Sequence, residues 1–384
     1  MVFIDSSVFY TRPKTHLKFV YLHCIKYFTI KNFFIGIAYG LIIVVIVAFV
    51  NVLFRLIDEL MFPNYKDIEI KQPVFIISNP RSGTTFLHRL MCMDEDKFVY
   101  NLLYHTILPS ITLFRMIDFF GKIDKKIGRP MRKFFDYIDN KMFSAWDDIH
   151  ATGFNKTEED EGLHFVSGIS PSIGLITPHL KAFKELYIPD KLDDKANDQM
   201  KIFYKATIQR WMYALGYDKM FLCKTVMSTG RLQMLHDIFP DVKIIFLLRN
   251  PYEAIPSFTS MFAEPWNTFY PEVPENSEAY REWGEVGIAY YKYFYEQKQN
   301  FKQENLITIP YTDLIKNPKE TVLKIYNQLQ LEVTPTFLEK LTAETQKSRK
   351  YSSKHEYSLE QYGFEKDHIY KELKMIFEEL QLEK

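Results

Sequence analysis

Residues 33–54 form an uninterrupted apolar run that carries no charge, with Asn51 as its one strongly polar residue. A helix rises about 1.5 Å per residue, so this run is roughly 33 Å long, enough to cross the hydrocarbon core of a bilayer. A buried core helix is the alternative, but such helices rarely stay apolar on every face. The run is too long and starts too late for a cleavable signal peptide. We therefore predict a transmembrane helix over residues 33–54.

The charges that flank this run bear on its orientation. Residues 1–32 carry five basic side chains against the single acid Asp5, whereas residues 55–72 mix both signs. This bias places the N-terminus in the cytoplasm. Residues 17–28 could instead lie in the membrane interface or form a re-entrant hairpin, so both orientations stay open. We expect a single-pass membrane protein, in the inner membrane if bacterial and with a Golgi-type lumenal domain if eukaryotic.

The rest of the chain alternates strand-like apolar runs with helical stretches. Strands are predicted over residues 74–78, 220–223, 242–248 and 306–310. Helices are predicted over residues 85–91, 198–215, 231–238, 278–301 and 318–329. Such alternation indicates right-handed crossovers and a parallel sheet with helices on both faces. We predict an α/β fold with a basic segment at 1–32, the membrane helix at 33–54, a juxtamembrane linker at 55–72 and one large domain at 73–384.

Composition excludes some classes of function. Hydrophobic residues make up 47% of the chain and charged residues 25%, which supports a packed core. The net charge is zero at pH 7, so no global field attracts nucleic acid, and we expect no nucleic-acid partner. The three cysteines, Cys24, Cys92 and Cys223, give neither a disulfide framework nor zinc-ligand spacing.

Residues 79–85 read Asn-Pro-Arg-Ser-Gly-Thr-Thr and lie between the first predicted strand and its helix. Gly83 permits close backbone approach, and successive N–H groups before a helix N-terminus form an anion cradle. The two threonines add hydroxyl donors, and Arg81 adds a fixed positive charge. An ordinary turn capped by a hydroxyl side chain is the plain structural alternative.

A kinase or other NTPase is the sharper alternative. Its phosphate loop needs a first glycine and a Gly-Lys-Ser/Thr ending, because the lysine reaches the outer phosphates and the hydroxyl holds Mg²⁺. Residues 79–85 have neither feature, and no acid that could hold a metal follows a later strand. We expect a site for an anionic group without a metal ion.

A second anion site is predicted where the strand at 242–248 ends. Arg249 follows this strand directly, at the edge where ligands bind in open α/β sheets. Pro251 suits the first position of a helix, and Ser257 lies further along it. A guanidinium binds a terminal phosphate bidentately, although an Arg at a strand end is by itself more often part of a surface ion pair.

These motifs resemble those of the P-loop sulfotransferase superfamily, in particular its Pro-Arg-Ser-Gly-Thr-Thr branch. The resemblance runs from about residue 61 to the C-terminus. It implies that the 5′-phosphosulfate of 3′-phosphoadenosine 5′-phosphosulfate, the co-substrate, is held by Arg81, Ser82, Gly83, Thr84 and Thr85. It further implies that Arg249 and Ser257 hold the 3′-phosphate and that Lys224 faces the donor. Cytosolic members usually have Lys in place of Arg81, which leaves the charge role intact.

Two further segments resemble motifs of this superfamily. A basic segment at 349–359 resembles one that folds over the nucleotide, and a solvated charge run explains it equally well. An acid-rich segment, residues 157–161, resembles a Glu-rich motif, and a solvated helix start with Thr157 as N-cap is its alternative. We predict Glu159 or His150 as the catalytic base, with His105 as a weaker candidate.

The leading hypothesis is thus a sulfotransferase that moves a sulfuryl group from this donor to a hydroxyl or amine of a glycan, lipid or other small acceptor. A P-loop kinase and an inactive membrane protein of the same fold are the alternatives. The missing lysine and metal ligands count against the kinase, and the Arg81 loop together with Arg249 and Ser257 argues against the inactive protein. The sequence identifies neither the acceptor nor the oligomeric state.

Overall fold

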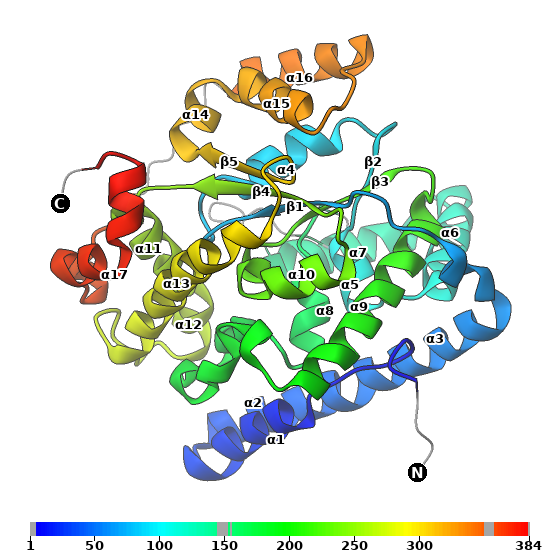
Figure 1. Ribbon diagram of the computed structural model, residues 1–384. Coiled ribbons are helices and arrows are strands. Elements are labelled where there is room, and N and C mark those ends of the chain that lie inside the picture. The colour runs from blue at the N-terminus through cyan, green and yellow to red at the C-terminus, as the bar shows by residue number, and fades with distance from the viewer. Residues whose placement is uncertain (1–4, 144–152, 154–155, 349–356, 383–384) are drawn as a thin grey trace. The chain divides into compact units, whose positions relative to one another are not determined.

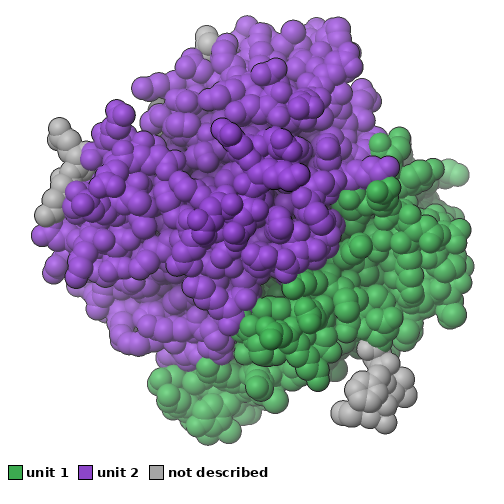
Figure 2. Space-filling model, viewed as in Figure 1, with its two compact units in different colours: residues 1–70, 101–170, 192–218 green, residues 71–100, 171–191, 219–384 purple. Residues whose placement is uncertain are grey.

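The computed structural model describes residues 5–143, 153, 156–348 and 357–382. The chain forms two compact units, coloured separately in Figure 2. Unit 1 comprises residues 1–70, 101–170 and 192–218, and unit 2 comprises residues 71–100, 171–191 and 219–384. Residues of the predicted domain at 73–384 therefore contribute to both units. The predicted division at 32, 54 and 72 stays a prediction.

Unit 2 contains a five-stranded parallel sheet with the strand order β2-β3-β1-β4-β5. The strands are β1 (Val74–Ile77), β2 (Phe98–Val99), β3 (Met220–Lys224), β4 (Lys243–Leu248) and β5 (Leu306–Pro310). The central strands are apolar on both faces because helices cover both sides of the sheet. The predicted α/β fold with a central parallel sheet is confirmed.

The two faces of the sheet are covered by different helices (Figure 1). Val74, Ile76 and the alternate residues of the neighbouring strands pack in one cluster with α4 (Thr84–Cys92), α15 (Pro318–Gln328) and α16 (Pro335–Ser348). On the other face Phe246 stacks on Phe294 of α13 (Glu278–Gln297), with ring centroids 3.5 Å apart. The strands thus alternate their side chains between two buried layers. The remaining helices of unit 2 are α10 (Leu232–Ile238), α11 (Pro251–Ser260), α12 (Ala263–Phe269), α14 (Tyr311–Lys316) and α17 (Lys366–Glu379).

Unit 1 is helical over most of its described residues. Its helices are α1 (Pro13–Tyr21), α2 (Ile30–Tyr39), α3 (Ala48–Met61), α5 (Leu103–Ile107), α6 (Ile111–Lys126), α7 (Pro130–Phe143), α8 (Glu161–Val166) and α9 (Asp194–Leu215). A π-helical segment, Gly40–Val47, joins α2 to α3 without a break, so that one helix runs over Ile30–Met61. Among the described residues this is the helix that is long and apolar enough to cross a membrane. It contains the predicted span at 33–54 and seven residues of the predicted linker.

Candidate active site

The loop between β1 and α4 has the backbone geometry of an anion cradle. Arg81 and Gly83 are both left-handed, with φ of 68° and 81°. Gly83 occupies the N-cap position of α4, and a Cβ atom there would lie 3.1 Å from the Tyr311 ring and 3.2 Å from Leu314. Glycine is thus required both by the backbone conformation and by the space. Alternating backbone conformations of this kind turn successive N–H groups toward one point, in front of a helix N-terminus.

Hydrogen bonds to two other elements fix this loop. The amide of Asn79 donates to the carbonyl of Gly287 in α13 at 3.0 Å. The Thr229 hydroxyl donates to the carbonyl of Ser78 at 3.1 Å. Both bonds are buried, so the loop is held in place before any ligand binds.

Two buried groups at the loop are suited to an anion. The hydroxyl of Ser82 is buried and has no hydrogen-bond partner among the described residues. A buried hydroxyl without a partner costs free energy unless a ligand supplies one. Lys224, fully buried at the end of β3, donates from Nζ to Thr85 Oγ1 at 3.0 Å. The ammonium and the loop therefore lie together, as the resemblance implies.

Arg249 lies directly against this loop. Its Nη1 donates to the carbonyl of Arg81 at 2.6 Å, and its guanidinium lies 4.6 Å from the centre of the Tyr311 ring. Nε and Nη2 each lie 3.2 Å from Glu253 Oε2. The hydroxyl of Tyr291 donates to the Arg249 carbonyl at 2.8 Å, which fixes the end of β4. Arg249, predicted for the second anion site, therefore lies against the loop predicted for the first.

Ser257 lies in α11, the helix that follows Arg249. The helix begins with Asn250, whose side chain accepts from the Tyr252 N–H at 3.0 Å, and with Pro251 at its first position. Ser257 lies two turns further on, where it is buried. Arg249 and Ser257 thus lie close together in the sequence, at a strand end and in the helix that follows it. Both residues belong to unit 2.

The candidate bases belong to unit 1 or lie outside the described residues. His150 lies outside them, as do residues 349–356 of the late basic segment. Glu159 is half-buried and precedes α8. His105 is buried, which lowers its pKa to about 3, and its Nδ1 accepts from the Leu102 N–H at 3.0 Å. One ring nitrogen of His105 is thus occupied by the backbone, and the choice of Glu159 or His150 as the base, with His105 as the weaker candidate, stays a prediction.

The acid-rich segment is not a solvated helix start. α8 begins at Glu161, and Thr157 instead forms a β-bridge with Leu102. Asp160 is fully buried and accepts a hydrogen bond from Tyr204 of α9. The alternative with Thr157 as N-cap is therefore wrong, because these residues pair with other elements of unit 1.

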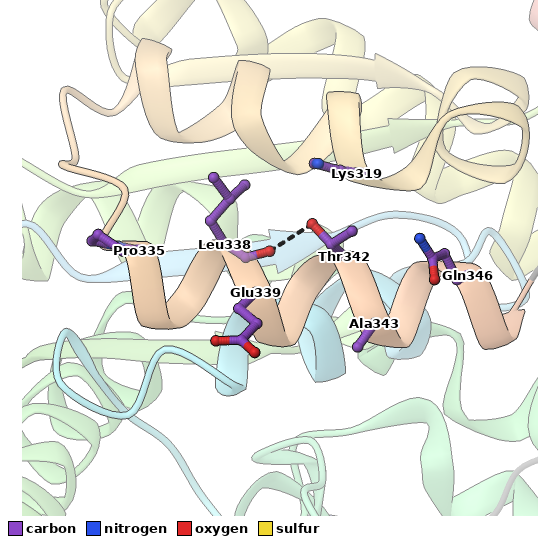
Figure 3. A pocket seen from close by; sticks show the side chains of 7 residues that line it. All are labelled: Lys319, Pro335, Leu338, Glu339, Thr342, Ala343 and Gln346. Carbon is purple, nitrogen blue, oxygen red and sulfur yellow. Dashed lines mark hydrogen bonds between the residues drawn. The ribbon is translucent and has the colours of Figure 1, made fainter.

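A shallow depression elsewhere in unit 2 is drawn in Figure 3. It lies on the surface of α15 and α16 and is lined by Lys319, Pro335, Leu338, Glu339, Thr342, Ala343 and Gln346. None of the predicted site residues lines it, and we assign it no role.

Comparison with known proteins identifies the family. The Sulfotransferase family matches residues 73–335, a region that includes both predicted anion sites. This chain belongs to the Sulfotransferase family. Membership decides against the kinase alternative, in agreement with a loop that lacks the Gly-Lys-Ser/Thr ending.

Curated relatives are distant sulfotransferases. The omega-hydroxy-beta-dihydromenaquinone-9 sulfotransferase Stf3 of Mycobacterium bovis is 22% identical over 272 residues, which cover 70% of this chain and 65% of Stf3. The match therefore spans slightly less than two thirds of that relative's length. A 3-alpha-hydroxysteroid sulfotransferase of Cavia porcellus is 32% identical over 115 residues, 29% of this chain and 37% of the relative.

Solved sulfotransferases share the fold over nearly the whole chain. Sulfotransferase STF9 from Mycobacterium avium aligns with a TM-score of 0.69 at 14% identity, covering 98% of both chains. STF1 from Mycobacterium tuberculosis aligns with a TM-score of 0.62 at 18% identity, covering 96% of this chain and 99% of STF1.

Sequence reasoning missed two contacts of Arg249. Tyr291 and Tyr311 touch it, yet neither belongs to a motif that we singled out, whereas Glu253 lies within the segment 249–257 and forms the ion pair given as the alternative. Tyr311 follows β5 directly, so the rule that ligands bind at the carboxyl ends of parallel strands could have found it. Tyr291 reaches Arg249 from the middle of α13, and no local pattern marks it.

Proposed function

We propose that this sulfotransferase family member transfers a sulfuryl group from 3′-phosphoadenosine 5′-phosphosulfate to a hydroxyl or amine of its acceptor. In this reaction the acceptor oxygen or nitrogen bonds to sulfur, the bond from sulfur to the phosphate oxygen breaks, and adenosine 3′,5′-bisphosphate leaves with that electron pair. The observation that carries the proposal is the contact of Arg249 with the carbonyl of Arg81, because it makes two anion sites adjacent. We propose no metal for this site.

The residues of the loop fit the 5′-phosphosulfate end of the donor. The backbone N–H groups from Ser82 to Thr85 would surround its oxygens, and the free hydroxyl of Ser82 would gain a partner. Lys224, beside Thr85, and the side chain of Arg81 would stabilise the charge that develops on the leaving phosphate.

Arg249 and Ser257 would hold the 3′-phosphate. The guanidinium of Arg249 is 17% exposed and is shared with Glu253, whose side chain is 56% exposed. A phosphate would therefore compete with a solvated carboxylate for the guanidinium. The planar fork of arginine N–H groups favours a phosphate that accepts two parallel hydrogen bonds from it. Glu159 or His150 would take the acceptor proton.

A lipid hydroxyl is the acceptor class that we favour. Stf3, the relative matched over 70% of this chain, is named for a hydroxylated menaquinone, which is a membrane lipid. We also propose attachment to a membrane through the helix Ile30–Met61, whose length and composition support it. Length and composition alone are compatible with the single pass predicted at 33–54, either in an inner membrane or with a lumenal domain. They are equally compatible with a helix that lies in the plane of the membrane interface.

Donor binding and transfer test the proposal separately. Adenosine 3′,5′-bisphosphate without Mg²⁺ should raise the melting temperature, since a ligand at 100 times its Kd adds about 2.7 kcal/mol of stability. ATP with Mg²⁺ should have little effect, and the reverse pattern would contradict the proposal. Sulfur-labelled donor should then label lipid alcohols in a panel that also holds glycans and phenols. Transfer to glycans alone would refute the lipid assignment.

A further inference from the structure

The helix Ile30–Met61 buries a polar stripe within unit 1. Asn32, Asn51, Arg55 and Asp58 are buried at helical spacing, each at most 7% exposed. The Asn51 amide donates to the Ile107 carbonyl at 3.0 Å. Polar side chains that are buried and hydrogen-bonded in this way attach one face of the helix to the rest of its own unit.

The charged residues of this stripe make the strongest of these contacts. Arg55 donates from Nη1 to Thr207 Oγ1 of α9 at 2.8 Å. The carboxylate of Asp58 accepts from the N–H groups of Ile111 and Thr112 at 3.0 and 2.8 Å, at the N-terminus of α6. A carboxylate in this position also interacts favourably with the helix dipole. The helix is therefore firmly joined to α6 and α9.

The opposite face of the same helix is apolar and exposed. Ile30, Phe34, Phe49 and Leu60 are 74%, 65%, 65% and 84% exposed. This helix buries polar side chains and exposes apolar ones, whereas a surface helix of a soluble protein buries its apolar side. Apolar side chains exposed over the length of a helix of this size indicate contact with a partner or a membrane.

Helices α6 and α7 extend this apolar surface. α6 packs against α3, and α7 packs against α6. Both helices expose consecutive aromatic residues, Phe119 and Phe120 in α6 and Phe134 and Phe135 in α7. By contrast, the exposed large apolar side chains among the described residues of unit 2 are few: Phe269, Ile315, Leu338 and Met375. Exposed large apolar side chains are therefore concentrated in unit 1.

Basic residues are interleaved with the aromatic ones along residues 111–143. The exposed cationic side chains of this segment are Arg115, Lys122, Lys125, Lys126, Arg129, Arg132, Lys133 and Lys141. Lys122 and Arg132 pair with Asp118 and Asp136 at 2.6 and 3.0 Å, both within one helix. Over residues 111–143 the basic residues outnumber the acidic ones. Aromatic side chains interleaved with lysine and arginine fit the interface of an anionic bilayer, where the charged ends reach the headgroups.

We propose that the exposed apolar residues of Ile30–Met61, α6 and α7 form a membrane-docking face, which seats unit 1 in one leaflet of an anionic bilayer. The helix Ile30–Met61 lies in the plane of the interface and does not cross. A crossing by residues 33–54 would draw the parts of unit 1 that pack on this helix into the hydrocarbon, or would break contacts such as the hydrogen bond from Asn51 to the Ile107 carbonyl and the ring contact of Tyr39 with Phe165. This inference rests on the proposed membrane attachment and is independent of the transferase chemistry.

Vesicle binding tests the docking face. The full chain should float with vesicles of phosphatidylcholine and phosphatidylglycerol and bind phosphatidylcholine vesicles more weakly. The double substitution Phe119→Asp and Phe120→Asp should lower partitioning about tenfold or more, because charge replaces apolar area. Leu338→Asp, an exposed leucine in unit 2, is the matched control and should bind as the unsubstituted protein does.

Further variants and melting curves test whether weaker vesicle binding results from unfolding. Lys125→Glu with Lys126→Glu, both on exposed positions, should weaken binding to the anionic vesicles alone. Equal melting temperatures for all variants would exclude unfolding as the cause. Absence of vesicle binding by the unsubstituted protein, or binding that neither pair of substitutions lowers, would overturn the proposal. A dimer that hides this face and binds no vesicles would overturn it as well.

Labelling from one side of the membrane tests the in-plane orientation. Lys31→Cys and Asn64→Cys flank the helix at exposed positions, in a Cys24→Ser background that leaves the buried Cys92 and Cys223. With an impermeant maleimide, both sites should react from the same side of sealed membranes. Reaction from opposite sides would establish a single pass and refute the in-plane helix. Nucleotide binding measured on the same preparations separates either result from a failure of the proposed transferase function.

Discussion

Arg249 shows how one side chain can serve both the fold and a ligand. Its guanidinium bonds to the Arg81 carbonyl, covers the Tyr311 ring and pairs with Glu253. The bond to Arg81 links the end of β4 to the phosphate loop. The partner that a phosphate would displace is Glu253, which is solvated, so the exchange costs little in the fold itself.

Lys224 is the residue whose loss should affect turnover most selectively. Lys224→Met keeps the buried methylene packing but removes the ammonium beside Thr85. We expect the rate of sulfuryl transfer to fall about 10²-fold, since a fixed donor to the leaving group is lost. Initial rates with labelled donor measure this effect. Lys316→Met, an exposed lysine of the same unit, is the control, and a Lys224 variant of normal rate would disprove the assignment.

Asp190 makes the stability of the fold depend on pH, and the direction of its pKa shift fixes the sign. Burial raises its pKa to about 6, although it accepts from the N–H groups of Gln233 and Met234 and from the Tyr293 hydroxyl. As pH rises from about 4 to about 6, the unfolded chain releases this proton before the folded chain does, so the stability contributed by Asp190 falls. Asp190→Asn lacks this titration. The free energy of unfolding of the variant minus that of the unsubstituted protein should therefore increase by roughly 1 kcal/mol for each pH unit in this window. Urea unfolding at several pH values measures the difference, and a constant difference would contradict it.

At the scale of elements, the loop between β1 and α4 depends on Gly83. Gly83→Ala combines an unfavourable φ of 81° with a Cβ 3.1 Å from the Tyr311 ring. Gly128→Ala is a matched control, because φ is 90° there and nothing lies within 4 Å. Each substitution should cost about 1 kcal/mol for the backbone conformation, and only Gly83→Ala should weaken binding of adenosine 3′,5′-bisphosphate. Melting curves and calorimetric titration measure the two effects, and equal binding by both variants would rule out a special role of this glycine.

The elements that the sequence predicted are those with a local signature. The strand that became β4 is a continuous apolar run that ends at Arg249, and the phosphate loop lies between a strand and a helix. β2 was missed because its two residues, Phe98–Val99, show no periodicity. The contact of Tyr291 with Arg249 joins elements far apart in sequence, and no pattern within either predicts it.

The helix Ile30–Met61 marks another limit of sequence reasoning. Its apolar run predicts a membrane helix, but the run alone does not show which side faces the protein. The structure buries Asn51, Arg55 and Asp58 and exposes apolar side chains such as Phe34, Phe49 and Leu60. Only the tertiary partners on α6 and α9 reveal this polarity, because they satisfy the charges of the buried stripe.

For the whole molecule, the two units divide the proposed tasks. The candidate nucleotide site belongs to unit 2, and the docking face belongs to unit 1, together with Glu159 of the acid-rich segment. Variants of the docking face should therefore leave nucleotide binding unchanged, and variants of Arg249 should leave vesicle binding unchanged. Coupled losses in both assays would contradict this division.

The most direct measurement compares two nucleotides by calorimetric titration. The unsubstituted protein should bind adenosine 3′,5′-bisphosphate about tenfold or more tightly than adenosine 5′-phosphate, because Arg249 and Ser257 add a charge-assisted site for the second phosphate. Arg249→Ala and Ser257→Ala should each reduce this preference and leave the affinity for the monophosphate nearly unchanged. A preference that survives both substitutions would contradict the claim that these two sites bind one nucleotide.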